Sequence, residues 1–343
     1  MEEEYRILEG VLKDFVSKFV ENNSLRLENE KISEDVLSAV AEQGYFSLVP
    51  PDGGEPDMKA YSLVLRNIAR AAPSISLRIM LSNSFVAAAN GSKEAGEVSS
   101  GKKFGTVTFS DFLLPRGQNG DLKIENGRLV GEKVFVFGSD SDYILTLLDS
   151  GELALVTSGF SRGKEHRKLG FRSIGFSTVK FDTNDFQIVE KDGFQVIERV
   201  YYELCVPVAS VALGMAEASL EKAVEYAKVR AAFSHYLKDF QPLAFDIAEL
   251  SARTEALRSL LADVLDKKSS LKERLYLKEL SLRLAKDASR SSLQVHGGYG
   301  YLEDFGIEKF YRDSMALSVL FNSEEKDMER LSTEVFGDRA GFV

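Results

Sequence analysis

The spacing of apolar residues changes twice along the 343-residue chain, and this double change is the strongest constraint on its fold. Apolar residues recur at helical intervals up to about Ser100, alternate with polar ones from about Lys103 to Asp192, and return to helical intervals from Gly193. Helical side chains repeat every 3.6 residues and strand side chains every two, so helices, strands and helices are predicted in that order. The predicted domains are an N-terminal α-helical domain (1–102), a β domain (103–192) and a C-terminal helical bundle (193–343).

Turn and capping residues indicate where the predicted elements begin and end. Ser33 is a predicted N-cap, Gly44 a predicted helix end, and Pro73 divides two apolar helical stretches. Asn126-Gly127 is a strong hairpin signal, because both residues accept the positive φ of a tight turn. A second pair of strands about Asp149-Ser150-Gly151 favours a small antiparallel barrel or sandwich.

The last part of the sequence predicts long antiparallel helices. Leu213, Ala216, Leu220, Ala223 and Ala227 form one apolar stripe, and two further long amphipathic stretches follow it. Long helices joined by short loops pack as a four-helix bundle. Because their apolar stripes need a mate, we expect a dimer or tetramer.

Charge and cysteine content exclude several functional classes. The net charge of -10 argues against a broad nucleic-acid surface, because phosphates require clustered Lys and Arg. No apolar run approaches the ~18 residues that cross a bilayer, and the acidic N-terminal sequence resembles no signal peptide. The single cysteine, Cys205, fits a reducing cytoplasm. His166, His235 and His296 lack metal-ligand spacing, so no metal site is expected.

Five segments spread along the chain follow one another in a recognisable order. They are AEQGYFSLVPPDGGE, KLGFRSIGFSTVKFD, LGMAEASLEKAVEYAKVRAAF, DFQPLAFDIAEL and QVHGGYGYLEDFGIEKFYRD. In this order they resemble the acyl-CoA dehydrogenase family over nearly the whole chain. The resemblance implies that family's three-part fold, FAD as cofactor, and removal of an α-proton and a β-hydride from an acyl-CoA.

The resemblance also implies a set of cofactor contacts near the C-terminus. They are Arg230 and Phe233 of an R-x-x-F element, Gln241, Gln294, Gly297 and Gly298. In the family these elements embrace the adenine half of an FAD bound mainly to the neighbouring subunit. Glycine lets backbone N–H groups approach a diphosphate, and arginine supplies a bidentate cation. The alternative is that the glycines only end a helix and form a turn.

The family's catalytic base, a glutamate after the Y-R-D element, is missing from its usual place. Counting forward from Asp313 gives Phe321 at that position, and counting back from Arg330 gives Ser323. The base must be a carboxylate in an apolar pocket, because desolvation raises its pKa enough to take a weakly acidic proton. Glu324 is one candidate base; the alternative is that Ser323 caps a helix whose acidic first turn holds Glu324.

Some family members carry the base at the start of the first bundle helix, which corresponds to Leu204 in this sequence. The neighbouring Glu203 is the second candidate base, although one residue along a helix turns the side chain by about 100°. The family's substrate-side arginine corresponds to Cys205, and a lone cysteine in an apolar run is more typical of packing.

The predicted flavin-ring side also departs from the family. The T-E-P loop corresponds to TFSDFLLP, with Ser110 and Asp111 in place of Glu-Pro, and the W-I-T strand becomes Phe135-Val136-Phe137. The residues that differ from the family pattern are therefore mainly those through which a subunit contacts the flavin bound to itself. The residues that match the family pattern are those that contact the flavin of the neighbouring subunit.

We therefore expect an acyl-CoA dehydrogenase-type flavoprotein that oxidises an acyl-CoA thioester to an enoyl-CoA. One mechanism is an active homo-oligomer that uses Glu203 or Glu324; the other, ranked slightly higher, is a degenerate subunit beside a catalytic homologue. A flavin monooxygenase of the same fold and a non-catalytic scaffold are the alternatives. Acyl-CoA, an oligomer mate and an electron-transfer flavoprotein are the expected partners.

Overall fold

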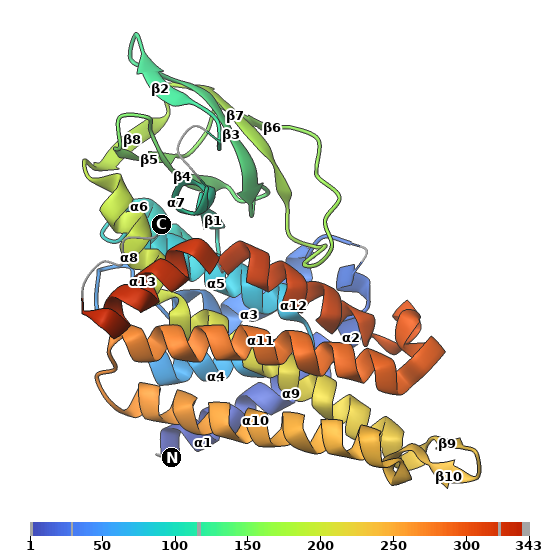
Figure 1. The fold of residues 1–343 in the computed structure, drawn as a ribbon. Coiled ribbons are helices and arrows are strands. Elements are labelled where there is room, and N and C mark those ends of the chain that lie inside the picture. Colours follow the sequence, from blue (N-terminus) through green and yellow to red (C-terminus); the bar gives the residue numbers. More distant parts are fainter. Residues whose placement is uncertain (1–2, 29, 115–117, 322–323, 338–343) are drawn as a thin grey trace.

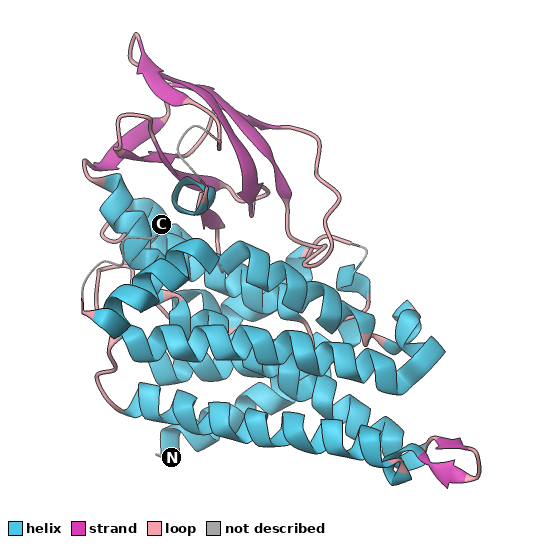
Figure 2. Ribbon diagram, in the orientation of Figure 1, coloured by secondary structure: helices cyan, strands magenta, loops and turns pink. Residues whose placement is uncertain are grey.

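The computed structural model describes residues 3–28, 30–114, 118–321 and 324–337, with the side chains of Glu324 and Glu325 left out. Helices from both ends of the chain pack together, and the strands form a separate unit on one side of them (Figure 1). Figure 2 shows the same separation of helix and strand, apart from the short helix α7 among the strands and a small hairpin at the far end of the bundle. The predicted order of helices, strands and helices is confirmed.

The first helical part ends just before the strands. The predicted boundaries hold: α3 starts directly after Ser33, Gly44 has a φ of 75°, and Pro73 is the first residue of α5. The Ser33 hydroxyl, however, accepts a hydrogen bond from Arg26 (2.6 Å) and caps no helix N–H. The elements are α1 (Glu3–Phe15), the π-helical η1 (Val16–Val20), α2 (Glu21–Asn23), η2 (Arg26–Glu28), α3 (Glu34–Glu42), η3 (Tyr45–Ser47), α4 (Met58–Ala69), α5 (Pro73–Ala88) and α6 (Lys93–Ser99).

The strands form two four-stranded sheets with a shared core. The orders are β1-β4-β5-β8 and β2-β3-β7-β6, and both predicted turns are confirmed, at Asn126-Gly127 and at residues 149–151. The prediction of an antiparallel unit is wrong for one pair, because β1 runs parallel to β4. The elements are β1 (Gly105–Val107), α7 (Ser110–Leu113), β2 (Leu122–Glu125), β3 (Arg128–Phe137), β4 (Tyr143–Leu147), β5 (Leu153–Val156), β6 (Phe160–Arg162), β7 (Phe176–Thr183) and β8 (Phe186–Glu190).

The second helical part contains the longest helices of the molecule. The elements of this part are α8 (Gly193–Glu203), α9 (Cys205–Val229), β9 (Ala231–Ala232), β10 (His235–Tyr236), η4 (Leu237–Asp239), α10 (Gln241–Asp266), α11 (Leu271–His296), η5 (Gly297–Tyr301), η6 (Glu303–Phe305), α12 (Glu308–Phe321) and α13 (Glu324–Phe336). The α8–α9 stretch is long and apolar enough to cross a membrane, yet 89% of its apolar window is buried inside the protein. Its apolar residues therefore belong to the core of the fold.

One buried carboxylate ties the two helical parts together. Glu217 of α9 is 2% exposed and pairs with Arg66 (3.3 Å) and Arg70 (2.9 Å) of α4, and with Arg258 (2.7 Å) of α10. Because α4 comes from the first helical part, these ion pairs join segments that the sequence separates by the whole β unit. The two domain boundaries predicted at residues 102/103 and 192/193 stay predictions.

Candidate functional site

The glycine-rich segment after α11 forms an open turn at the end of the bundle. Gly297 has a φ of 57°, and a Cβ atom added to Gly297 or Gly298 would meet no atom within 4 Å. Gly300 differs, because its Cβ would lie 2.8 Å from the carbonyl oxygen of Leu293. The first two glycines therefore leave exposed backbone that a ligand can approach, whereas Gly300 allows close packing.

Two hollows flank this turn. A cavity of about 370 Å³ is lined by Arg230, His296, Gly297, Gly298 and Tyr299, among others. The Arg230 guanidinium lies 6.0 Å from the centre of the Tyr299 ring and has no ion-pair partner among the described residues. A guanidinium, glycine backbone that a ligand can approach and an aromatic face are a suitable set for a diphosphate next to a flat base.

The second hollow, of about 560 Å³, lies on the other side of Gly297. Gln294 lines it together with Arg290, Gly300 and two tyrosines, Tyr301 and Tyr311. The sequence offered no motif for Arg290, but its position one helical turn before Gln294 was a usable signal. The structure thus brings Arg230, Gly297 and Gly298 together in one hollow and Gln294 into the adjoining one.

The other two predicted cofactor residues lie at this end of the bundle but outside both hollows. Phe233, in the β9–β10 hairpin, is 91% exposed with a φ of 51°, and Gln241 is the exposed first residue of α10. Backbone pairing of Leu237 with Arg230 (2.8 Å) holds the hairpin base against the end of α9. Phe233 and Gln241 are therefore exposed near the two hollows and line neither of them.

His296 beside the turn is a packed histidine. Its Nδ1 bonds to the Ser292 carbonyl (2.7 Å), its ring stacks on Tyr226 at 4.3 Å, and burial lowers its pKa. Within the described residues, no three His, Cys, Asp or Glu side chains are grouped to hold a metal ion.

On the predicted flavin-ring side, the polar groups are already bonded within the chain. Asp111 of α7 pairs with Lys133 (2.8 Å), and both side chains are at most 5% exposed. The same carboxylate accepts hydrogen bonds from the Leu147 N–H (3.0 Å), from Asn119 and from the Thr108 hydroxyl. The Thr108 hydroxyl, at the start of the TFSDFLLP segment, is therefore turned inward. Pro115 of this loop lies outside the described residues.

The neighbouring strand β3 is interrupted by a β-bulge. The register of β3 against β7 shifts between Lys133 and Val136, and Phe135 within this bulge has a φ of 56°. The Phe135 ring is half exposed and stacks on Phe176, while Val136 points into the β core. The bulge was absent from the sequence prediction, which treated the strand as regular.

Phe321, which counting from Asp313 aligns with the family's catalytic base, is part of a cluster of packed aromatic side chains. Phe321, at the end of α12, is 3% exposed and packs against Phe109 with ring centres 5.8 Å apart. Tyr201 packs against Phe109 and Phe112, and its hydroxyl donates to the Phe321 carbonyl (3.0 Å). Ser323, the other counted position, lies outside the described residues. Among the described residues, the cluster of Phe109, Phe112, Tyr201 and Phe321 contains no carboxylate that could act as the base in place of Phe321.

A buried ion pair next to this cluster was missed by the sequence analysis. Lys278 of α11 is 1% exposed and contacts Asp327 of α13 at 2.7 Å, while Tyr201 of α8 also hydrogen-bonds to Asp327 (2.9 Å). One signal was available, because Lys278 lies on the same helical face as the buried Leu275 and Leu282. This triad joins α8, α11 and α13.

The two candidate bases have different surroundings. Glu203, the last residue of α8, is 46% exposed and makes a two-pronged ion pair with Arg199 (3.0 and 3.2 Å). Glu324 is the first residue of α13, and its side chain lies outside the described part of the structure. Cys205 is fully buried, which raises the pKa of its thiol to about 11. The assignment of Glu203 or Glu324 as the catalytic base therefore stays a prediction.

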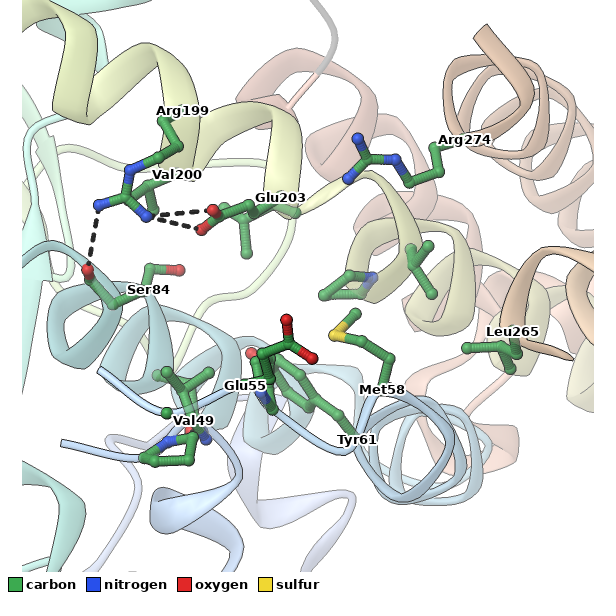
Figure 3. Close-up of a pocket in the computed structure, with 18 of the residues that line it drawn as sticks. Val49, Glu55, Met58, Tyr61, Ser84, Arg199, Val200, Glu203, Leu265 and Arg274 are labelled. Carbon is green, nitrogen blue, oxygen red and sulfur yellow. Dashed lines mark hydrogen bonds and ion pairs between the residues drawn. The ribbon is translucent and has the colours of Figure 1, made fainter. Parts of the chain in front are cut away.

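Glu203 and Leu204 line a cavity with a volume of about 780 Å³. This cavity lies among α4, α5, the α8–α9 junction and the α10–α11 connection. Figure 3 shows Glu203 turned towards Arg199, with Met58 and Tyr61 on the opposite wall and Arg274 reaching in from α11. This cavity was not predictable from local sequence patterns, because its walls come from four separate parts of the chain.

Comparison with known proteins was made on sequence and on fold. A sequence model described as acyl-CoA dehydrogenase, C-terminal domain, matches residues 191–333. A subunit of the caffeyl-CoA reductase–Etf complex from Acetobacterium woodii is 23% identical, over 92% of this chain and 94% of that protein. An acyl-CoA dehydrogenase from Bacillus subtilis is 25% identical, over 94% and 95%.

The fold has equally extensive counterparts among solved structures. A glutaryl-CoA dehydrogenase from Mycobacterium smegmatis in complex with FADH2 superposes with a TM-score of 0.86 at 16% identity. The match covers 100% of this chain and 97% of that one. The arrangement of helices, two sheets and helical bundle is therefore shared over the full length of both chains.

Proposed function

The chain belongs to the acyl-CoA dehydrogenase family of flavoproteins, and on that premise we propose that it is the flavin-clasping subunit of a hetero-oligomer. In this role it lends C-terminal contacts to an FAD held mainly by a catalytic homologue. The complex oxidises an acyl-CoA thioester to the enoyl-CoA. An FADH2-bound relative of the same fold and an Etf-complex relative support FAD and an electron-transfer flavoprotein as the redox partners.

One observation carries this proposal: the two halves of the family's cofactor site are in opposite states. Arg230, Gln294 and Gly298 are exposed at the end of the bundle, and the side chains of Arg230 and Gln294 have no hydrogen-bond partner among the described residues. The Gly297 backbone is exposed too, although its N–H bonds to the Gln294 and Leu293 carbonyls. Asp111, on the ring side, is buried in an ion pair. Groups already bonded within the chain offer few donors to a flavin ring, whereas open groups can serve another molecule.

The chemistry of the exposed groups fits the adenine half of FAD. Arg230 would pair with the diphosphate, the exposed backbone at Gly298 would approach it, and Gln294 would bond the adenine edge. When bound, FAD accepts the hydride that leaves the β-carbon of the acyl group. The base that takes the α-proton comes from the homologue, because Phe321 has no proton-accepting group.

Native mass spectrometry with flavin quantitation tests the proposal. The isolated chain should form no monomer and should retain little FAD. Mixed with a homologue that carries an intact T-E-P loop, W-I-T strand and base, it should give a complex with about one flavin per pair of chains. One tightly bound FAD per chain in the isolated homo-oligomer would contradict the proposal and would favour Glu203 or Glu324 as a displaced base.

The Arg230→Ala variant sharpens this test at one residue. Loss of a charge-assisted contact to the diphosphate should weaken flavin retention in the mixed complex by roughly 1.5–3 kcal/mol. Arg128→Ala, on the β2–β3 hairpin away from the bundle end (Figure 1), is the matched control and should retain flavin fully. Equal retention in both variants would show that Arg230 has only a structural role.

A further inference from the structure

The sequence contains three Asn-Gly dipeptides, at residues 90–91, 119–120 and 126–127. In such a dipeptide the backbone nitrogen of the glycine can attack the side-chain amide carbon of the asparagine and close a five-membered ring. A following glycine favours this reaction, because it has no Cβ atom to hinder the bent backbone that ring closure needs. Since the local sequence is the same at all three places, the surrounding fold decides which of them can react.

Asn119-Gly120 is held in the interior of the β unit. Asn119 is 6% exposed, and its side-chain amide donates a hydrogen bond to the Asp111 carboxylate. A Cβ atom added to Gly120 would clash with the Glu132 carbonyl oxygen, so this turn has no room to rearrange. Reaction here requires local opening of the β unit, which costs free energy.

Asn90-Gly91 is at the surface, but both of its reacting groups are bonded. The Gly91 N–H donates a hydrogen bond to the Pro51 carbonyl (2.7 Å), and the Asn90 side-chain amide donates one to the Ala87 carbonyl (3.4 Å). The attacking nitrogen must first lose its proton, so a hydrogen bond through that proton opposes the reaction. The second bond holds the amide carbon of Asn90 against the end of α5.

Asn126-Gly127 has neither kind of protection. It is the exposed two-residue turn between β2 and β3, and in the described part of the chain neither the Asn126 side chain nor the Gly127 N–H has a hydrogen-bond partner. A Cβ atom added to Gly127 would meet no atom within 4 Å. The hairpin extends away from the helices (Figure 1), so fraying of its last pair, Glu125 with Arg128, is enough to let the turn rearrange.

We propose that Asn126 is a site of spontaneous deamidation, which the fold selects over Asn90 and Asn119. The Gly127 nitrogen loses its proton to solvent and bonds to the Asn126 amide carbon, while the carbon–nitrogen bond of the side-chain amide breaks and ammonia leaves. Water then opens the cyclic imide at either carbonyl and gives aspartate or isoaspartate. One water is added and one ammonia is lost, so the reaction needs no oxidant or reductant. This inference goes beyond the flavin-clasping function and does not depend on it.

The modification changes the hairpin in two ways. Either product adds a negative charge to a chain whose net charge is already -10, next to Arg128, which pairs with Asp182 (2.6 Å). Isoaspartate also routes the backbone through the former side chain and so adds a carbon atom to the turn. Because turn length fixes the register of a hairpin, we expect the isoaspartate form to lose the pairing of Glu125 with Arg128.

Prolonged incubation of the full chain at pH 8, followed by isotope-resolved peptide mapping, tests the proposal. We expect deamidation of Asn126 to be at least tenfold faster than that of Asn90 or Asn119, because those two react only after local opening. The same incubation in urea is the control, and there the three dipeptides should react at similar rates. Asn126→Gln should remove the mass change from its peptide, since glutamine closes the corresponding larger ring far more slowly.

Three results would overturn the proposal. They are an unmodified Asn126 after long incubation, equal or faster reaction of Asn90 or Asn119 in the folded chain, and the same preference for Asn126 in urea. The last result would show that the fold does not make the selection. An assay with protein L-isoaspartyl methyltransferase should detect isoaspartate in the incubated chain and much less in Asn126→Gln. Flavin is absent from all these measurements, so failure of the flavin clasp leaves their outcome unchanged.

Discussion

Asp313 carries a carboxylate with no contact to solvent. One oxygen accepts a hydrogen bond from the Phe171 N–H (2.5 Å), and the other has no partner among the described residues. Burial, followed by repulsion from Glu28, raises its pKa to about 7, although Arg312 and Lys309 act in the opposite direction. The protein therefore holds a carboxyl group that is half protonated near neutral pH.

This raised pKa makes a prediction about stability and pH. A carboxyl whose pKa is higher in the folded state stabilises the fold at low pH and loses that contribution as pH rises from about 4 to about 7. Asn cannot ionise and keeps the bond to Phe171, so Asp313→Asn should gain up to about 4 kcal/mol over the unmodified chain across this window. Urea unfolding at pH 4, 6 and 8 measures the difference. A difference independent of pH would contradict the raised pKa.

The candidate bases give a second prediction at single residues. If the chain acts alone, Glu203→Gln or Glu324→Gln should slow acyl-CoA-dependent flavin bleaching by about two to four orders of magnitude, because an amide cannot accept the proton. FAD content should be unchanged, which separates loss of the base from loss of the cofactor. If the chain acts as the clasping subunit, bleaching in the mixed complex should survive both substitutions.

At the residue scale, the sequence predicts a local feature of the structure well only where residue type alone carries the information. The open backbone at Gly297 and Gly298 was predictable, because glycine is needed where a ligand approaches the main chain. The Lys278–Asp327 pair was not, because its two residues are 49 positions apart and their partnership depends on how α11 meets α13. Local patterns contain no information on such a contact.

At the scale of elements, turns were predictable and pairings were not. The Asn126-Gly127 hairpin between β2 and β3 follows from two residues that accept positive φ. The parallel pairing of β1 with β4 needs a crossover through β2 and β3, which no local pattern reveals. Burial of α9 on nearly all sides over its first half likewise reflects neighbours from both helical parts.

The triad of Tyr201, Lys278 and Asp327 predicts how α13 is held against α8 and α11. Lys278→Met leaves a buried carboxylate without its cation, and Asp327→Asn leaves a buried ammonium without its anion. Each should cost about 3–5 kcal/mol in the free energy of unfolding, because an unpaired buried charge is strongly destabilising. The double variant should cost much less than the sum of the two. Guanidinium unfolding measures the cycle, and additive costs would contradict direct coupling.

At the scale of the whole molecule, exposed apolar side chains gather at the end of the bundle that carries the glycine turn. Phe233 and Tyr301 are 91% and 86% exposed, and Val229, Tyr236 and Phe245 add further apolar surface. Isolated exposed apolar residues are common in monomers, but a group of this kind indicates a protein contact. The exposed clasp residues are part of the same end, so one contact would bury both.

This arrangement predicts that assembly and flavin retention are lost together. Phe233→Ser combined with Phe245→Ser should shift the chain towards the monomer in analytical ultracentrifugation, because the substitutions remove large apolar groups from the contact. The melting temperature of the monomer should hardly change, since neither ring is part of the core. Ile124→Ser, at an exposed position on β2, is the matched control and should leave assembly intact. A double variant that assembles normally and still retains the homologue's flavin would place the mate on another face.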